Sequence, residues 1–148
     1  MDDEIEIDSH RAALEQVIDV LTPLRQHRQA SAERAQHEAQ VQLESLHQQL
    51  QQTRAAYTQE REYQRERRQG LSEANLNKSL SLNDVDRWHE KEKRMLDQLA
   101  YIRQNVLTQR LDIDQQQLHL QQAQAAVRAS QRAVEKLSCL REALNEEG

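Results

Sequence analysis

The chain has 148 residues, of which 36% are hydrophobic, 30% charged and only 3% aromatic, with two Gly, one Pro and no Phe. A compact globular domain of this size is usually about 45 to 50% apolar and richer in Gly and Pro. The shortage of turn residues argues against β-sandwiches, barrels and doubly wound sheets. A mean hydropathy of -1.01 leaves either disorder or a long, thin helical seam.

Charge and residue usage favour the helical alternative. The 20 basic residues nearly balance the 25 acidic ones, giving a net charge of -5, and Gln, Ala, Leu, Glu and Arg predominate. These five residue types are good helix formers. With a pI near 5.7, the chain as a whole is not expected to bind nucleic acid through its charge.

The first predicted segment is an acidic tail over residues 1–8, which suits a helix N-terminus or the docking of a basic partner. A first long helix is predicted over residues 9–70. Its apolar and small seam positions are Leu14, Val17, Leu21, Leu24, Ala32, Ala35, Ala39, Leu43, Leu46, Leu50, Thr53 and Tyr57. The steps of 4, 4 and 3 from Ala35 to Leu46 resemble an eleven-residue repeat. Thr22 and Pro23 resemble an N-cap and a first helical position, so a kink or restart is predicted near 22–23.

The segment 71–83 is rich in Asn and Ser and is predicted to connect two helices. Gly70 before it is a candidate C-cap, and Ser81 or Asn83 is a candidate N-cap. The chain is therefore expected to reverse direction near residue 77.

A second long helix is predicted over residues 84–145, because heptad positions continue without a skip. They are Val85, Trp88, Glu92, Met95, Leu99, Ile102, Val106, Gln109, Ile113, Gln116, Leu120, Ala123, Val127, Ser130, Val134, Leu137, Arg141 and Leu144. Thirteen of the eighteen are apolar. The polar members weaken the seam but help to define its register.

The two halves match in length and pattern if the chain folds back on itself. A reversal near residue 77 places Leu43 near Ile113, Leu50 near Val106 and Tyr57 near Leu99. The predicted fold is an all-α antiparallel two-helix coiled-coil hairpin, with a parallel homodimer of extended helices as the alternative.

No pattern predicts catalysis or a bound cofactor. His89 and Lys93 stand where a zincin motif needs two His residues on one helix face, and the six His residues are too scattered for a metal site. There is no Gly-rich phosphate loop, and a two-helix rod has no pocket that excludes water. Cys139 is predicted to be an unreactive surface thiol. We therefore expect neither an enzyme nor a metalloprotein.

Two groups of residues are candidates for partner binding. A stripe of Ala100, Leu107, Leu111 and Leu118 is predicted to lie away from the seam, as in helices that dock into a groove. The second group, Arg61, Arg65 and Arg68, belongs to an arginine-rich run with interspersed Glu. That run predicts a solvated helix face with i,i+4 ion pairs more strongly than a nucleic-acid site.

The whole-chain composition and the two long helices meeting between Gly70 and Asn83 resemble the YscO/FliJ/HrpO family of type III secretion and flagellar export proteins. The resemblance implies an antiparallel coiled-coil stalk that sits in the hexameric export ATPase, contacts the export gate protein and handles secretion chaperones. It implies a cytoplasmic protein at the cytoplasmic face of the secretion apparatus. No apolar run long enough for a membrane span and no signal peptide is expected from the sequence.

Two alternative functions remain open. One is a chaperone or escort that holds clients through the outward Leu stripe. The other is a purely structural coiled-coil spacer.

Overall fold

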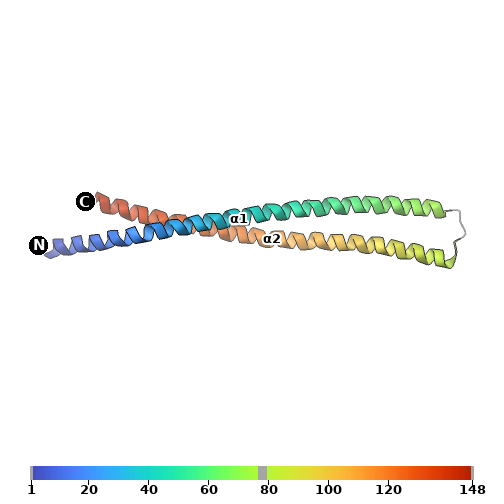
Figure 1. The fold of residues 1–148 in the computed structure, drawn as a ribbon, viewed down its shortest axis with the longest axis horizontal. Helices are drawn as coiled ribbons and strands as arrows, with labels where there is room; N and C mark the ends of the chain where they lie inside the picture. The colour runs from blue at the N-terminus through green and yellow to red at the C-terminus, as the bar shows by residue number, and fades with distance from the viewer. Residues whose placement is uncertain (1, 77–79, 148) are drawn as a thin grey trace. The chain divides into compact units, whose positions relative to one another are not determined.

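The computed structural model describes residues 2–76 and 80–147, which fold into two helices and contain no strand (Figure 1). Helix α1 spans Asp2–Asn75 and helix α2 spans Leu82–Glu146, with 74 and 65 residues. The two helices pack against each other as an all-α helical hairpin, which confirms the predicted fold class. The chain does not adopt the alternative of extended helices that pair only between copies.

The hairpin consists of two compact units. Unit 1 contains Met1–Gln42 and Gln116–Gly148, and unit 2 contains Leu43–Gln115. Each unit therefore brings one stretch of α1 against one stretch of α2. The few Gly and Pro residues and the many Gln, Glu, Leu, Ala and Arg residues explain why both stretches are helical.

The predicted seam of α2 is confirmed. Of its eighteen heptad positions, all but Arg141 are buried or half-buried in their units. Met95, Leu99 and Ile113 are among the most buried positions of unit 2, and Leu137 is among those of unit 1. Arg141 is exposed, and its guanidinium reaches across to Asp19 with an N–O distance of 2.5 Å.

The predicted seam of α1 is only partly correct in unit 1, where Leu21 and Ala32 are half-buried and Ala39 is buried. Leu14, Val17 and Leu24 are 41%, 50% and 44% exposed, whereas Ile18 is 2% exposed. Arg25, seven residues after Ile18, is half-buried at an equivalent seam position. Its guanidinium donates a 2.8 Å hydrogen bond to the Ala133 carbonyl. Long polar side chains can cover a seam with their methylene groups, so the row facing α2 is not the most apolar row.

The eleven-residue repeat is also absent from the structure. Ala35 is exposed and Gln36 is half-buried in its place, so the seam of unit 1 runs through Ala32, Gln36 and Ala39 with ordinary heptad steps. The prediction failed because it preferred an alanine to a glutamine at a seam position.

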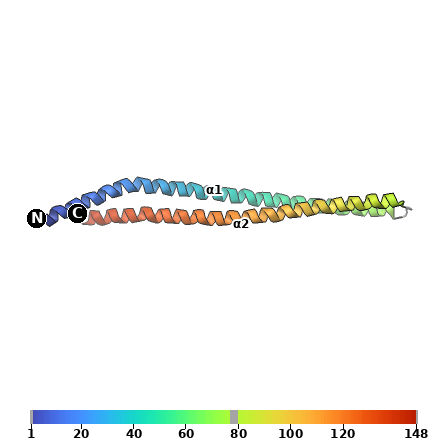
Figure 2. The same ribbon diagram turned by 90° about the horizontal axis from the view of Figure 1, so that it is seen from below.

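Helix α1 does not restart at Pro23, which lies inside the helix. Pro23 is exposed and has no N–H to donate to the carbonyl four residues earlier. Thr22 does not act as an N-cap, because its hydroxyl donates a 2.7 Å hydrogen bond to the Ile18 carbonyl. Figure 2 shows α1 curved in its blue, N-terminal part. Proline and back-bonded threonine both bend helices without ending them.

The predicted boundaries of the helices need correction. The acidic segment 2–8 is helical rather than a tail, and α1 passes through Gly70 to Asn75. Gly70 has no positive φ and is not the C-cap. The expected centre of the reversal, residue 77, lies outside the described residues.

Helix α2 begins at Leu82 rather than at residue 84 and ends at Glu146. Ser81 is its N-cap, because the Ser81 hydroxyl accepts a 3.3 Å hydrogen bond from the Asp84 N–H. Of the two candidate caps, the structure therefore selects Ser81 over Asn83. The carboxylate of Asp84 in the first turn also stabilises the helix, because it lies at the positive end of the helix dipole.

Hydrogen bonds across the seam show the register. In unit 1, Gln116 donates a 3.1 Å bond to the Ala39 carbonyl, one residue from the expected pairing. In unit 2, Tyr57 pairs with Arg103, about one helical turn from the expected Leu99. The hairpin register is therefore close to the one that the apolar pattern predicts.

Candidate partner-binding surfaces

A basic groove surrounds Tyr57 in unit 2. The Arg103 guanidinium on α2 donates a 3.0 Å hydrogen bond to the Tyr57 hydroxyl on α1, and its central carbon lies 5.9 Å from the ring centroid. This combines a hydrogen bond with a cation–π contact. Arg54, Arg110 and Val106 line the same groove. Arginines from both helices therefore line the groove at Tyr57.

The electrostatics of the groove favour negative charge. The hydrogen bond from Arg103 lowers the pKa of Tyr57 from its usual 10.0. Desolvation opposes this effect, and the charges of Arg103 and Arg61 lower the pKa further. The same positive charges would attract an acidic group on a partner.

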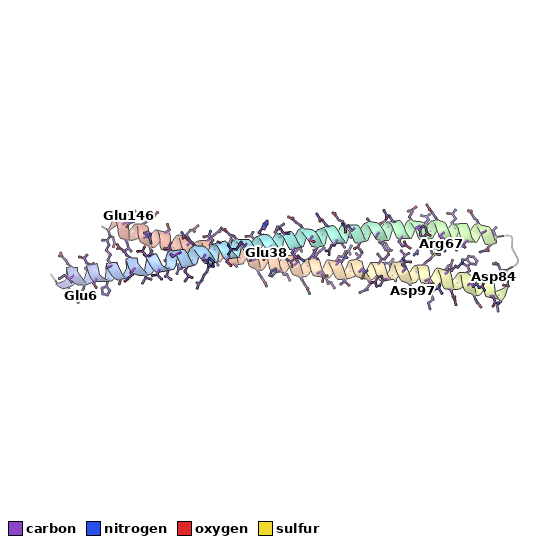
Figure 3. All side chains as sticks on the ribbon, in the orientation of Figure 1. Glu6, Glu38, Arg67, Asp84, Asp97 and Glu146 are labelled. Carbon is purple, nitrogen blue, oxygen red and sulfur yellow. The ribbon has the colours of Figure 1, made fainter. Side chains whose placement is uncertain are left out.

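Of the three predicted arginines, only Arg61 acts on Tyr57, and none of the three lines the groove. Arg61 and Arg65 are exposed on α1, and Arg61 acts on Tyr57 through its charge. Arg68 is half-buried, and its Nε has no hydrogen-bond partner among the described residues. The expected i,i+4 ion pairs with Glu are not formed within the described part of this run. Figure 3 shows the side chains that line the helices, with Arg67 of this run labelled.

Sequence reasoning missed Arg103 and Arg110, which α2 contributes. Each looks like an ordinary exposed arginine in the sequence. The signal that could have found them is the hairpin register, because it places the α2 residues just after Leu99 beside Tyr57.

The predicted apolar stripe of α2 is exposed. In unit 2, Leu107 and Leu111 are 46% and 64% exposed, and Ala100 is exposed as well. In unit 1, Leu118 is 60% exposed. None of the four contributes to the seam of its unit, so these side chains are free for another protein.

Unit 1 carries a second set of exposed apolar residues that sequence reasoning had assigned to the seam. These are Leu14, Val17 and Leu24 on α1. Leu140 on α2, which was not among the predicted seam positions, is also 46% exposed. Arg25 and Arg28 on α1 line a hollow with Ala129, Ala133 and Lys136 of α2. Unit 1 thus has an apolar surface next to a basic one.

Polar residues interrupt the seam in both units. Gln109, Gln116 and Ser130 are half-buried, as expected for seam positions. Gln64 is 1% exposed, and its Oε1 has no hydrogen-bond partner in the described part of the chain, although its Nε2 donates to Glu60. Sequence reasoning missed Gln64, since the apolar pattern of α1 had been followed only to Tyr57.

Other kinds of site find little support in residues 2–76 and 80–147. Within these ranges no three His, Cys, Asp or Glu side chains are grouped to hold a metal ion. Cys139 is exposed. Neither helix, within the same ranges, contains an apolar stretch long enough to cross a bilayer.

The sequence matches no family model, and neither a curated protein nor a solved structure matches it.

Proposed function

We propose that this protein is a non-enzymatic stalk of a type III secretion apparatus, which couples the hexameric export ATPase to the export gate protein and also handles secretion chaperones. The observation that carries the proposal is the helical hairpin itself, whose two units expose chemically different side chains on their outer surfaces. The resemblance of the whole chain to the YscO/FliJ/HrpO family supplies the biological context.

A stalk works through its sides rather than through a cavity. It changes the conformational equilibrium of surrounding subunits only when it binds their states with different affinity. Unit 1 offers Leu14, Val17 and Leu140 beside Arg28 and Lys136, whereas unit 2 offers the arginines around Tyr57. Such unlike surfaces would contact equivalent subunits of a ring unequally.

In this proposal the helix ends in unit 1, residues 14–24 and 134–144, enter the ATPase ring. The connection between the helices then faces the export gate, and the protein acts at the cytoplasmic face of the apparatus. The exposed apolar side chains near the helix ends supply the area that such a contact would bury.

The test is the ATP hydrolysis rate of the purified cognate ATPase with and without this protein. The wild-type protein should change the rate, and Leu14→Gln should reduce the effect, because Leu14 is an exposed residue of the helix end 14–24 that the proposal places inside the ring. Val41→Gln is the matched control, since Val41 is an exposed apolar residue elsewhere on α1. An unchanged rate with the wild-type protein would argue strongly against the stalk.

A second candidate function is favoured by the exposure of Leu107, Leu111 and Leu118. An escort protein could hold aggregation-prone clients on these side chains. Replacing all three with Gln should abolish the suppression of client aggregation, measured by light scattering, while the helical circular dichroism is retained. A purely structural spacer would show neither ATPase stimulation nor client holding.

A further inference from the structure

Helix α1 of unit 1 carries a second heptad row beside the one that packs on α2. Its positions are Asp3, Ile7, His10, Leu14, Val17, Leu21, Leu24 and Arg28, with alternating steps of four and three. Such a row lies on one side of a helix and is what a coiled-coil partner recognises. Leu21 is half-buried at the border with the seam, whereas Ile7, Leu14, Val17 and Leu24 are 41% to 64% exposed.

The two flanks of unit 1 differ in how their charges are satisfied. On one flank, Asp19 binds Arg141, and both line a hollow with Glu15 and Asn145. The other flank holds the second row together with the hollow that Arg28 shares with α2. That flank combines exposed apolar side chains with charges that form no ion pair among the described residues.

The charges on this flank are segregated along α1. Asp3 and Glu6 lie at its N-terminal end, where Figure 3 labels Glu6. Arg28 lies at the other end of the row, beside Lys136 of α2. None of these four side chains forms an ion pair with a described residue. Along α1 from its N-terminus, the side chains of this flank are therefore first acidic, then apolar and finally basic.

The first turns of α1 also extend past their last hydrogen bond to α2. The most N-terminal hydrogen bond between the helices, among the described residues, runs from the Arg11 guanidinium to the Leu144 carbonyl. Ile5 and Ile7 precede it and are 69% and 64% exposed. A helix end that packs on nothing is stabilised by propensity alone, so a further packing surface would stabilise these turns.

We propose that a second copy of this chain packs antiparallel on this row. Reversing the row places Leu14 opposite Val17 of the second copy, and Ile7 opposite its Leu24. Asp3 then faces Arg28 of the second copy, and the same contacts repeat through the two-fold axis. Each copy also contributes its α2, so the interface is a four-helix bundle with an apolar centre and ion pairs at both ends.

A second copy fits better than an unrelated acidic helix, because the order of acidic, apolar and basic residues is its own complement when reversed. An acidic helix would pair with Arg28 and Lys136 but would leave Asp3 and Glu6 without a partner. The inference goes beyond the proposed stalk function. It implies that the free protein covers the unit 1 surface that a stalk would offer to the ATPase.

Sedimentation equilibrium of the full chain tests the dimer without any ATPase, so its outcome is independent of the stalk proposal. The wild-type protein should sediment at twice its monomer mass of 17.4 kDa. Val17→Lys brings two ammonium groups near the two-fold axis and should yield monomers. Val41→Lys is the control and should remain dimeric, because Val41 has the same 50% exposure as Val17 but lies outside the row.

A charge reversal keeps the test valid if Val17→Lys disturbs folding. Arg28→Glu should weaken the dimer at least tenfold at low salt, and adding Asp3→Arg in the same chain should restore it. Spin labels at His27, in a Cys139→Ser background, should lie about 35 Å apart along the axis in an antiparallel dimer. A monomeric wild type, equal dimerisation of Val17→Lys and Val41→Lys, failed rescue by Asp3→Arg, or labels within about 20 Å would each overturn the proposal.

Discussion

Replacing Gly70 with alanine should stabilise the protein, because Gly70 lies inside α1 rather than at its end. Its φ is not positive, and a Cβ added there would meet no atom within 4 Å. Alanine therefore fits the native backbone without a clash and reduces the conformational freedom of the unfolded chain. The expected gain in the free energy of unfolding is about 0.5 to 1 kcal/mol.

Urea unfolding followed by tryptophan fluorescence measures this gain in unit 2, which contains both Gly70 and Trp88. Trp88 is the single tryptophan and lines a hollow in unit 2 with Leu71 and Asn75, just beyond Gly70. Ala74→Gly, at an exposed position of the same helix end, is the reciprocal variant and should lose a similar amount. A left-handed C-cap at residue 70 would instead make Gly70→Ala destabilising, and that sign would refute the assignment of α1 through Asn75.

Three further predictions concern the seam, a cap and the basic groove. Gln64→Leu should raise the free energy of unfolding by about 1 kcal/mol, because it removes a buried oxygen that has no partner among the described residues. Urea unfolding measures this gain, and Gln69→Leu at an exposed position is the control. Ser81→Ala should cost about 1 kcal/mol through loss of the α2 cap, whereas Ser81→Asp should retain most of the stability in the same assay. Because the pKa of Tyr57 is lowered in the folded state, raising the pH from that pKa towards 10.0 should stabilise the fold. Arg103→Gln should raise the pKa of Tyr57 in a carbon-13 NMR titration and remove this alkaline gain, and an unchanged pKa would contradict the contact.

The fold could be predicted where apolar residues occupy the seam. Helix α2 is such a case, because Met95, Leu99, Ile113 and Leu137 repeat at heptad spacing and are all buried. Burial of apolar area is the dominant favourable term in packing, so the pattern and the structure agree there. The register followed from the same pattern together with the expected reversal near residue 77, and the contacts from Gln116 to Ala39 and from Arg103 to Tyr57 lie close to it.

The first part of α1 could not be predicted from the same rule. Two heptad rows lie side by side there, one through Ile18 and Arg25 and one through Leu14, Val17 and Leu24. A count of apolar residues selects the second row. The structure selects the first for α2, because the methylene groups of Arg25 cover the seam while its guanidinium reaches a carbonyl. Such an anchor depends on where the facing helix places its carbonyl groups, which the sequence does not reveal.

Of the two candidate surfaces, one could be predicted from the sequence and the other could not. The Leu107 and Leu111 stripe could be predicted, because an apolar residue off a clear heptad seam must be exposed. The groove around Tyr57 could not be predicted, because Arg103 and Arg110 form it only together with residues of α1 that are far away in sequence. A residue's exposure follows from its own helix, whereas its neighbours follow from the register.

The two rows on α1 also explain how one thin seam can coexist with so much exposed apolar surface. In unit 1 polar contacts accompany the buried apolar residues: Arg11 reaches the Leu144 carbonyl, Arg25 reaches the Ala133 carbonyl, and Arg141 binds Asp19. The Arg11 contact satisfies a carbonyl in the last turns of α2, where no intrahelical donor is available. Because these contacts and the buried apolar residues hold α2 against the row of Ile18, the side chains of Leu14, Val17 and Leu24 remain exposed. In the proposed dimer, these exposed residues contact α1 of the second copy.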